Sequence, residues 1–430
     1  MSRTFASLSV RNFRYFFIGG LLSNIGTWIQ RIAQDWLVLT QLTDNSSSVL
    51  GLVTALQFLG IPIFAAYAGG IADRFSKRKV LLVTQLLLGL NALVLWALVF
   101  TDTVTLWHVY ALAFTQGVIA AFDSPARQAF VSEMVDSVRL TNAVGLNATS
   151  FNGARLIGPG VSGFLIAAFH DDVAPALLIN ALTFVAMLVA LLAMNPDELQ
   201  PAPRAARKGA ARGGIKYVAG HPEILVLFFI TFMLCTFGLN FQIFNATMAT
   251  EAFGRGAQDY GILGTIQAIG TLAAALVAAR RVAPRLRTIM ISLLVFSLAT
   301  FALAASPTFW VYAVFLMPAG FASLSVLTST NAAVQLSADP EYRGRVMSIY
   351  MAINMGGTPI GAPVIGWIGD VFGPRGSLLV GAGATLLCFV AISGYFFKHN
   401  GLRLHFEHEG HRLPHLEASW KRSGKWGTEH

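Results

Sequence analysis

Charged side chains are scarce in this chain of 430 residues, because Asp, Glu, Lys and Arg together make up 12% of it. Soluble globular domains carry roughly 25% charged residues. The hydrophobic share is 55% and the mean hydropathy is +0.62. A soluble protein of this composition would expose large apolar patches, which water-facing surfaces rarely do. The shortage of charge therefore predicts a polytopic membrane protein, long enough for about a dozen spans of about 20 residues each.

Three further features are missing. The two cysteines, Cys235 and Cys388, both fall in apolar runs, so no disulfide framework is expected. No G-x4-G-K-[ST] motif occurs, so we expect no ATP bound in a Walker loop. We also expect no cofactor and no enzymatic activity. A signal peptide is not expected either, since the first apolar run is too long and lacks a small-residue cleavage site.

Sustained hydrophobicity predicts twelve membrane helices, in two groups of six. The expected domains are an N-terminal six-helix bundle (1–194), a central loop (195–222), a C-terminal six-helix bundle (223–397) and a basic tail (398–430). The expected helices are 13–41, 49–70, 80–101, 105–123, 142–169, 174–194, 223–247, 259–279, 288–305, 308–329, 346–370 and 376–397.

The cations are distributed unevenly along this pattern. Of the 30 Lys and Arg residues, 26 lie before the first helix, in every second loop or in the tail. All these segments are cytoplasmic if the N-terminus is inside, so we expect both termini in the cytoplasm. Arg255 and Arg375 then lie outside, and Arg31 and Arg155 lie within the membrane. Because the cations cluster between apolar runs, a nucleic-acid partner is not expected.

The tail holds six of the nine histidines, at or after His399. His405, His408 and His411 are spaced at threes, which is compatible with a metal site. A solvated basic tail touching anionic lipid is the preferred interpretation, so no metal is expected.

Two segments that lie 203 residues apart resemble each other. The stretch "ARLIGPGVSGFLIAAF" from Ala154 aligns with "GTPIGAPVIGWIGDVF" from Gly357. The alignment matches Gly158 with Gly361, Gly163 with Gly366 and Phe169 with Phe372. Such an echo is typical of transporters built from two related six-helix halves.

A cluster of charge, "GGIADRFSKR", stands between the second and third expected helices. Its simplest role is to anchor the topology. The stretch also resembles the G-x-x-x-D-R-x-G-R-R signature of the major facilitator superfamily, with Ser76 in place of the second Gly. The matching residues are Gly69, Asp73, Arg74, Lys77 and Arg78.

The resemblance implies a conformational latch. It implies that Asp73 meets the start of the eleventh helix near 345–348, where a helix N-terminus stabilises a carboxylate. It also implies that Lys77 pairs with Asp123, near the inner end of the fourth helix. These contacts would close the inner side and favour the state open to the outside. The similar stretch around Asp370 is expected to be a turn on the outside.

The fifth helix resembles the superfamily's antiporter signature, G-x8-G-x3-G-P-x2-G-G, with Ala154 and Ser162 where Gly is usual. The simplest reading is a packing face of small residues with a bend at proline. The resemblance implies an exporter that works by exchange, most typically a drug–proton antiporter. The matching residues are Gly145, Gly158, Pro159 and Gly163.

The fourth helix departs from the family pattern. Its "ALAFTQGVIAA" resembles the R-x-x-Q-G-x-x-A-A segment, with Gln116 and Gly117 in place. Ala113 stands where the family has an arginine tied to proton coupling, so the usual coupling residue is absent.

The first helix carries Asn24, Trp28, Arg31 and Asp35, whose spacing places them on one face. Charges within a membrane are functional candidates by default. Arg31 and Asp35 form a natural i,i+4 pair. One alternative is a structural ion pair, or a solvated Asp35 near the outer interface. The other is that Asp35 exchanges Arg31, or a cationic substrate group, for a proton.

Arg155 on the fifth helix allows several roles. It could replace the missing arginine, hold a substrate anion, reach Asp35 across a cavity, or pack on backbone carbonyls. On the seventh helix, Asn240 and Phe244 belong to a polar stripe with Thr236 and Thr247. This stripe is either a cavity wall or a helix-packing face.

The resemblance spans the chain and is nearest to the bacterial branch with enterobactin-type exporters and macrolide-efflux proteins. It implies an all-α membrane fold with twelve helices in two pseudo-symmetric bundles, in the bacterial cytoplasmic membrane. The implied function is export of small amphipathic or hydrophobic molecules, drug-like or siderophore-like, by proton antiport and alternating access, with protons, substrate and lipid as partners of a monomer. The alternatives are an importer or uncoupled transporter of a metabolite or lipid, and a transport-dead sensor or assembly partner.

Overall fold

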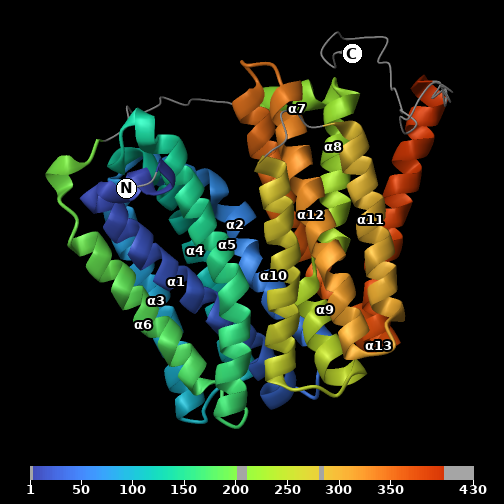
Figure 1. The fold of residues 1–430 in the computed structure, drawn as a ribbon, viewed down its shortest axis with the longest axis horizontal. Helices are drawn as coiled ribbons and strands as arrows, with labels where there is room; N and C mark the ends of the chain where they lie inside the picture. The colour runs from blue at the N-terminus through green and yellow to red at the C-terminus, as the bar shows by residue number, and fades with distance from the viewer. Residues whose placement is uncertain (1–2, 201–210, 280–284, 401–430) are drawn as a thin grey trace.

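The computed structural model describes residues 3–200, 211–279 and 285–400. Within these ranges the chain forms helices and no strand, and the long helices stand in two groups (Figure 1). The first group, the N half, comprises α1 (Arg11–Trp36, continued by the π-turn η2, Leu37–Leu42), α2 (Ser47–Arg74), α3 (Lys77–Phe100), α4 (Leu106–Met134), α5 (Ser137–Ala168) and α6 (Ala174–Leu192).

The second group, the C half, begins with an interrupted helix. This comprises α8 (Pro222–Met233), η4 (Leu234–Gly238), α9 (Phe241–Thr247) and η5 (Met248–Ala252). The rest of the C half is α10 (Ala257–Ala279), α11 (Leu286–Ala305), α12 (Phe309–Ser337) and α13 (Arg343–Asn400). Short helices precede α1 and join the halves: η1 (Arg3–Ser9), η3 (Pro196–Glu198) and α7 (Ala211–Ala219).

The twelve expected hydrophobic segments are all helical. α13 contains two of them, because Gly373 has a φ of 76° and divides the helix into two arms. By length and composition, eight helical segments in the described ranges could span a membrane, with both arms of α13 taken as one. The remaining long helices, α1, α4 and α5, carry more polar residues, including Arg31, Asp123 and Arg155. The helices that fall short are therefore those that hold most of the candidate site.

Helix starts follow from the local sequence. Ser46 caps α2 by accepting a hydrogen bond from the backbone N–H of Val49, and Asp136 caps α5 by accepting one from Arg139. Such side-chain caps satisfy backbone donors that a helix leaves free at its first turn. Short polar turns can therefore reverse the chain between long apolar helices.

The two ends of the bundle are distinguished by what lies there. The start of α1, all of α7 and the last described turns of α13 lie at one end, here called the terminal end (Figure 1). The α1–α2, α3–α4 and α5–α6 connections lie at the opposite end, here called the far end (Figure 1). α7 is joined to the C half by Tyr217, which stacks on Tyr342 at 4.4 Å and donates a hydrogen bond to Asp339.

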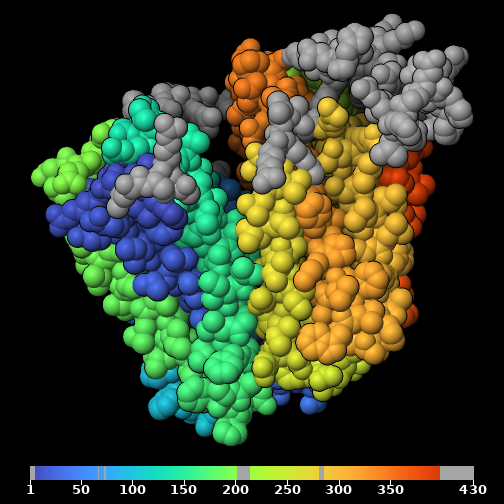
Figure 2. Space-filling model, viewed as in Figure 1, coloured from blue at the N-terminus to red at the C-terminus, as the bar shows by residue number. Residues whose placement is uncertain are grey.

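The halves contact each other toward the far end. α2 packs against α13, and α5 packs against α10. Gly163 of α5 lies directly against the backbone of α10 at Ala257. Toward the terminal end, Gly69 of α2 and Gly145 of α5 have no neighbour within 4 Å of where a β-carbon would stand. A cleft between the halves therefore opens at the terminal end and closes at the far end, as Figure 2 shows.

The contacts of α5 and α13 correspond to the similarity between the two sequence segments that start at Ala154 and Gly357. Gly158 of α5 packs on α1 at Trp28, and its counterpart Gly361 of α13 packs on the seventh span at Thr236. In each half this is the first span of that half, so the two glycines have equivalent neighbours. Gly163 and its counterpart Gly366 each contact the opposite half, on α10 and α2. At these four positions the two halves therefore pack in the same way.

Candidate functional site

Asp35 is the most completely buried charge of α1, with 0% of its surface exposed. Its Oδ2 accepts a hydrogen bond of 2.7 Å from the Tyr260 hydroxyl and one of 3.0 Å from the Gln242 amide. Its Oδ1 has no partner among the described residues. Both donors belong to the C half, on α10 and α9, so Asp35 joins the two halves at the closed end of the cleft.

Arg31 does not pair with Asp35. The two side chains form no ion pair within 4.0 Å in the described structure, and the carboxylate is instead hydrogen-bonded by Tyr260 and Gln242. The Arg31 guanidinium instead lies over the rings of Trp28 and Phe58, at 5.0 and 5.1 Å from their centres. Cation–π contact of this kind stabilises a cation by about 0.5–2 kcal/mol. The expected i,i+4 ion pair is therefore not formed in this state.

Arg155 meets the same tryptophan. Its guanidinium lies 5.6 Å from the centre of the Trp28 ring. Arg31, Trp28 and Arg155 each keep a partly accessible surface although they lie in the middle of their helices, as residues that border a cleft do. The structure brings together Trp28, Arg31 and Arg155, and holds Asp35 one turn deeper. Asn24, one turn from Trp28 on α1, is also partly accessible.

The seventh span presents a different face from the expected one. Asn240 is buried and donates a hydrogen bond to the carbonyl of Thr236 in its own span. Phe244 is fully buried, against Phe241 and Gly381 of the C half. The stripe is therefore a packing face here, and the cavity wall expected at these two residues does not form. The reason is the break in the helix at Leu239 and Asn240, which leaves the neighbouring Gln242 facing Asp35.

Gln116 on α4 is partly accessible, and its Oε1 has no hydrogen-bond partner in the described residues. Ala113, at the position of the missing arginine, is buried. Gly117 lies against the backbone of α2 at Leu56 and Gln57. The helix-4 segment therefore serves first to bring α4 and α2 together.

The antiporter-like segment of α5 packs against helices of both halves. Gly158 and Pro159 lie against α1 and α10 respectively, and Gly163 lies against α10. Ser162, where the family has Gly, donates a hydrogen bond of 2.8 Å to the Ile29 carbonyl of α1. Gly145 borders open space near the terminal end. Small residues thus allow α5 to fit closely between two helices.

The expected pairing of Lys77 with Asp123 is wrong for this state. Lys77 instead forms an ion pair of 2.8 Å with Glu133. The two helices are antiparallel, so the start of α3 lies level with the end of α4. Asp123 precedes Glu133 by ten residues, or about 15 Å along a helix.

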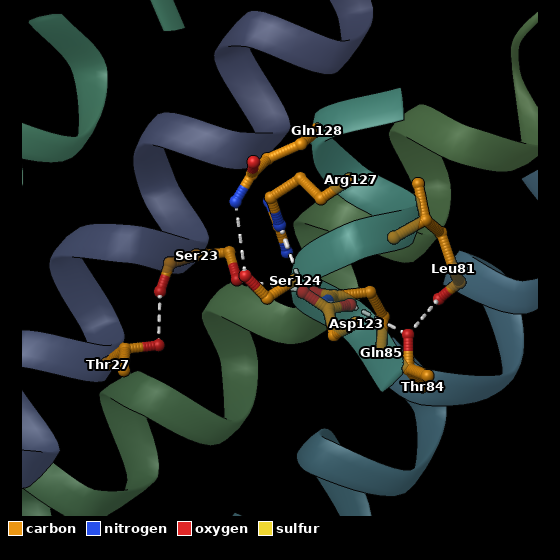
Figure 3. Close-up of polar contacts among 9 residues, drawn as sticks. All are labelled: Ser23, Thr27, Leu81, Thr84, Gln85, Asp123, Ser124, Arg127 and Gln128. Carbon is orange, nitrogen blue, oxygen red and sulfur yellow. Dashed lines mark hydrogen bonds and ion pairs between the residues drawn. The ribbon is translucent and has the colours of Figure 1, made fainter. Parts of the chain in front are cut away.

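Asp123 has its own partners deeper in the N half (Figure 3). Its Oδ1 accepts hydrogen bonds of 2.7 Å from both Thr84 and Gln85 of α3, and its Oδ2 pairs with Arg127 at 3.0 Å. Gln85 in turn accepts a hydrogen bond from Ser23 of α1. The network joins α1, α3 and α4, so it stiffens the N half as one body.

The other residues of the helix 2–3 signature have separate roles. Arg78 donates hydrogen bonds to the carbonyls of Leu191 and Leu192 at the end of α6. Cations at such a position complement the helix dipole. Arg74 is exposed, and Gly69 borders open space. The side chain of Asp73 lies outside the described part of the structure, so its contact with the eleventh helix remains a prediction.

Asp370 forms a latch at the far end, where a simple turn was expected. Its carboxylate, on α13, accepts hydrogen bonds from the hydroxyl of Ser46 (3.0 Å) and from the backbone N–H groups of Ser47 (2.6 Å) and Ser48 (3.1 Å). These donors are the first turn of α2 in the other half. A carboxylate at a helix N-terminus is stabilised by free N–H groups and by the helix dipole. Asp370 therefore joins the two halves at the far end.

Five residues of the site were not predicted from the sequence, among them Gln242, which lies beside the polar stripe of the seventh span. Tyr260 and Phe58 carry no signal, since isolated aromatic residues are common in apolar helices. Glu133 and Asp370 were discernible. Glu133 is an acid at the end of an apolar helix, and the "GWIGDVFGPR" around Asp370 resembles "GGIADRFSKR".

Comparisons with known proteins place the chain in a family. The sequence model of the MFS_3 family, described as transmembrane secretion effectors, matches residues 2–406. The chain belongs to this family, within the major facilitator superfamily. It is accordingly a multi-pass membrane transporter and not an enzyme.

Curated relatives agree with this assignment. The chain is 24% identical to the staphyloferrin A transporter of Staphylococcus aureus, over 93% of this chain and 99% of that protein. It is 23% identical to macrolide efflux protein A of Streptococcus pyogenes, over 36% of this chain and 37% of that protein.

Solved structures share the fold. A bacterial homologue of the human lysosomal transporter Spinster, in an inward-facing and unoccupied conformation, matches with a TM-score of 0.66 and 14% identity, covering 92% of this chain and 97% of that one. A D-xylose–proton symporter matches with a TM-score of 0.66 and 15% identity, covering 90% and 97%. At these identities the likeness shows the fold alone.

Proposed function

We propose that this transporter is a secondary active exporter of small siderophore-like or drug-like molecules, which exchanges them for protons by alternating access. The observation that carries the proposal is Asp35, a fully buried carboxyl group that accepts hydrogen bonds from Tyr260 and Gln242 of the opposite half. One ionisable group thereby lies on the same helix face as Arg31 and takes part in the far-end closure.

The geometry suggests how exchange is enforced. Hydrogen bonds to an ionised carboxylate are roughly twice as strong as those between neutral groups. Ionised Asp35 would therefore hold the empty carrier closed at the far end. Bound substrate would supply the free energy to open that end, and Asp35 would then take up a proton from the outside. The protonated carrier could return and release the proton inside.

Two other observations support export. The small residues of α5 that match the antiporter signature make the contacts between the halves at Pro159 and Gly163. The relatives include a transporter of staphyloferrin A and a macrolide efflux protein. With both termini inside, as the cation distribution predicts, the described state opens to the cytoplasm and is ready to load a substrate for export.

The test is accumulation of fluorescent amphipathic dyes in inside-out membrane vesicles, with and without a protonophore. We expect gradient-driven accumulation by the wild type and none by Asp35→Asn, which cannot carry a proton. Dye counterflow down its own gradient should survive in Asp35→Asn, because the cleft is intact. Asp102→Asn, in the exposed α3–α4 connection, is the matched control and should behave as wild type.

Other outcomes would contradict the proposal. Accumulation by Asp35→Asn that still collapses with the protonophore would remove Asp35 as the proton carrier. Dye flux that ignores the gradient in the wild type would favour the uncoupled or importing alternative. If the wild type itself gave no dye flux or counterflow above that of vesicles without the protein, a transport-dead sensor would be the better interpretation.

A further inference from the structure

The two arginines of the cleft lack the partners that buried cations usually have. Among the described residues, neither Arg31 nor Arg155 forms a hydrogen bond or an ion pair. Asp35, the acid on the same face of α1, attracts Arg31 without forming an ion pair with it and is hydrogen-bonded by Tyr260 and Gln242. The charged neighbour of Arg155 is Arg31, which repels it.

Such an arrangement is costly for a protein that functions empty. A cation within a membrane costs several kcal/mol unless it is paired or hydrated, and two like charges side by side add to that cost. Aromatic rings repay part of it, since Trp28 lies against both guanidinium groups and Phe58 lies against one. The N–H groups of both guanidinium groups have no hydrogen-bond acceptor among the described residues, and each arginine as a whole is partly accessible.

We propose that Arg31 and Arg155 together bind a substrate that carries at least two anionic oxygen groups, foremost carboxylates. The guanidinium fork matches a carboxylate with two parallel hydrogen bonds, and two forks on one tryptophan fit two such groups on one molecule. This inference rests on the proposed function, because it names the class of molecule that the same cleft exports.

The remainder of the substrate would lie against apolar surface. Phe58 borders Arg31, and Phe151 packs edge-on against Trp28 at 6.2 Å. The site therefore favours an anionic molecule with an apolar or aromatic part. It disfavours cationic drugs, because two unpaired positive charges would repel them.

The test uses two dyes with the same xanthene ring and opposite charge, carboxyfluorescein and rhodamine 123. Binding to the purified full-length protein in nanodiscs is measured by fluorescence polarisation, without any gradient. We expect carboxyfluorescein to bind and rhodamine 123 to bind at least tenfold more weakly. Unlabelled tricarballylate, a small tricarboxylate, should compete with carboxyfluorescein, and its neutral triester should not.

Four variants locate the site. Arg31→Gln and Arg155→Gln should each weaken carboxyfluorescein binding by roughly 10- to 100-fold, as expected for a lost hydrogen bond to a charged group. Arg31→Lys and Arg155→Lys keep the charge without the fork, so they should retain an intermediate affinity. Arg139→Gln, in an exposed ion pair with Asp136, is the matched control and should bind as wild type. A size-exclusion profile like that of the wild type establishes that each variant is folded.

The inference is overturned if rhodamine 123 binds as tightly as carboxyfluorescein. It is also overturned if the two Gln variants bind carboxyfluorescein as wild type does, or if neither carboxyfluorescein nor tricarballylate binds. The proposed export has a separate readout, the gradient-driven accumulation described above. Anion binding that depends on both arginines, without such accumulation, would support the site and contradict the exporter.

Discussion

At the scale of residues, the hydrogen bonds of Asp35 connect chemistry to conformation. A buried carboxylate is stable only if donors replace the water it has lost. Here the donors come from the opposite half, on Tyr260 and Gln242. Any movement that separates the halves at the far end must therefore break these bonds and open Asp35 to water.

The Tyr260 hydroxyl can be removed without changing the shape of the residue. Tyr260→Phe removes a hydrogen bond to a charged group, which contributes about 1.5–3 kcal/mol. We expect it to weaken the far-end closure and to reduce gradient-driven dye accumulation by roughly five- to tenfold. The measurement is the initial rate of accumulation in inside-out vesicles.

Tyr312→Phe provides the control for this prediction. Tyr312 is equally buried, but its hydroxyl donates a hydrogen bond of 2.9 Å to Asn245 within the C half. Its loss should lower the melting temperature without changing coupling. Equal loss of accumulation in both variants would show that the effect of Tyr260 is only one of stability.

At the scale of elements, two crossings hold the far end closed. α5 meets α10, and α2 meets the first arm of α13, in both cases through glycines that allow close approach. At the second crossing the carboxylate of Asp370 also accepts hydrogen bonds from backbone N–H groups in the first turn of α2. The expected latch around Asp73 would act on the same two helices at their opposite ends.

Removal of the Asp370 carboxylate should shift the balance between states. Loss of a helix cap costs about 0.5–2 kcal/mol, so we expect Asp370→Ala to increase the ratio of far-end-open to far-end-closed molecules by roughly 2- to 30-fold. Spin labels on Thr103→Cys and Ala305→Cys, one exposed far-end position on each half, would report the change as a longer distance. The native cysteines are buried.

Asp259→Ala is the matched change for this experiment. Asp259 also lies near the far end, but it pairs with Arg255 of the same half at 3.7 Å. In Asp259→Ala the distribution of distances between the two spin labels should remain that of the wild type. An unchanged distribution in Asp370→Ala would show that the far end stays closed without the carboxylate of Asp370.

At the scale of the whole molecule, the structure consists of two internally bonded halves with a cleft between them. The Asp123 network joins α1, α3 and α4 of the N half, and Ser297 joins α11 to α13 of the C half through the Ala382 carbonyl. Because each half is bonded within itself, rigid-body rocking is the motion expected for alternating access.

The orientation of this molecule in the membrane can be tested directly. We expect green fluorescent protein fused to either terminus to fluoresce, because the cation distribution places both ends in the cytoplasm. Alkaline phosphatase fused after Asp102, at the far end, should be active and should be inactive when fused at the C-terminus. The reverse pattern would invert the topology and would turn the described state into one open to the outside.

The sequence by itself determined the class of protein, the twelve hydrophobic segments and the charged residues that stand inside these segments. It could do so because transfer into lipid depends on stretches of about 20 residues, each of which can be judged alone. The grouping of Trp28, Arg31 and Asp35 on one face of α1 could be predicted in the same way, because it depends only on the spacing of these residues along the helix.

Only the tertiary structure decided what these residues contact. Tyr260 lies 225 residues from Asp35, and no periodicity connects them. The partner of Lys77 depended on the vertical register of α3 against α4, and the burial of Phe244 depended on a break at Leu239. The tertiary structure also decided which end of the cleft is closed. That depends on contacts between segments of the two halves that are far apart in the sequence, and the composition of one half does not determine it.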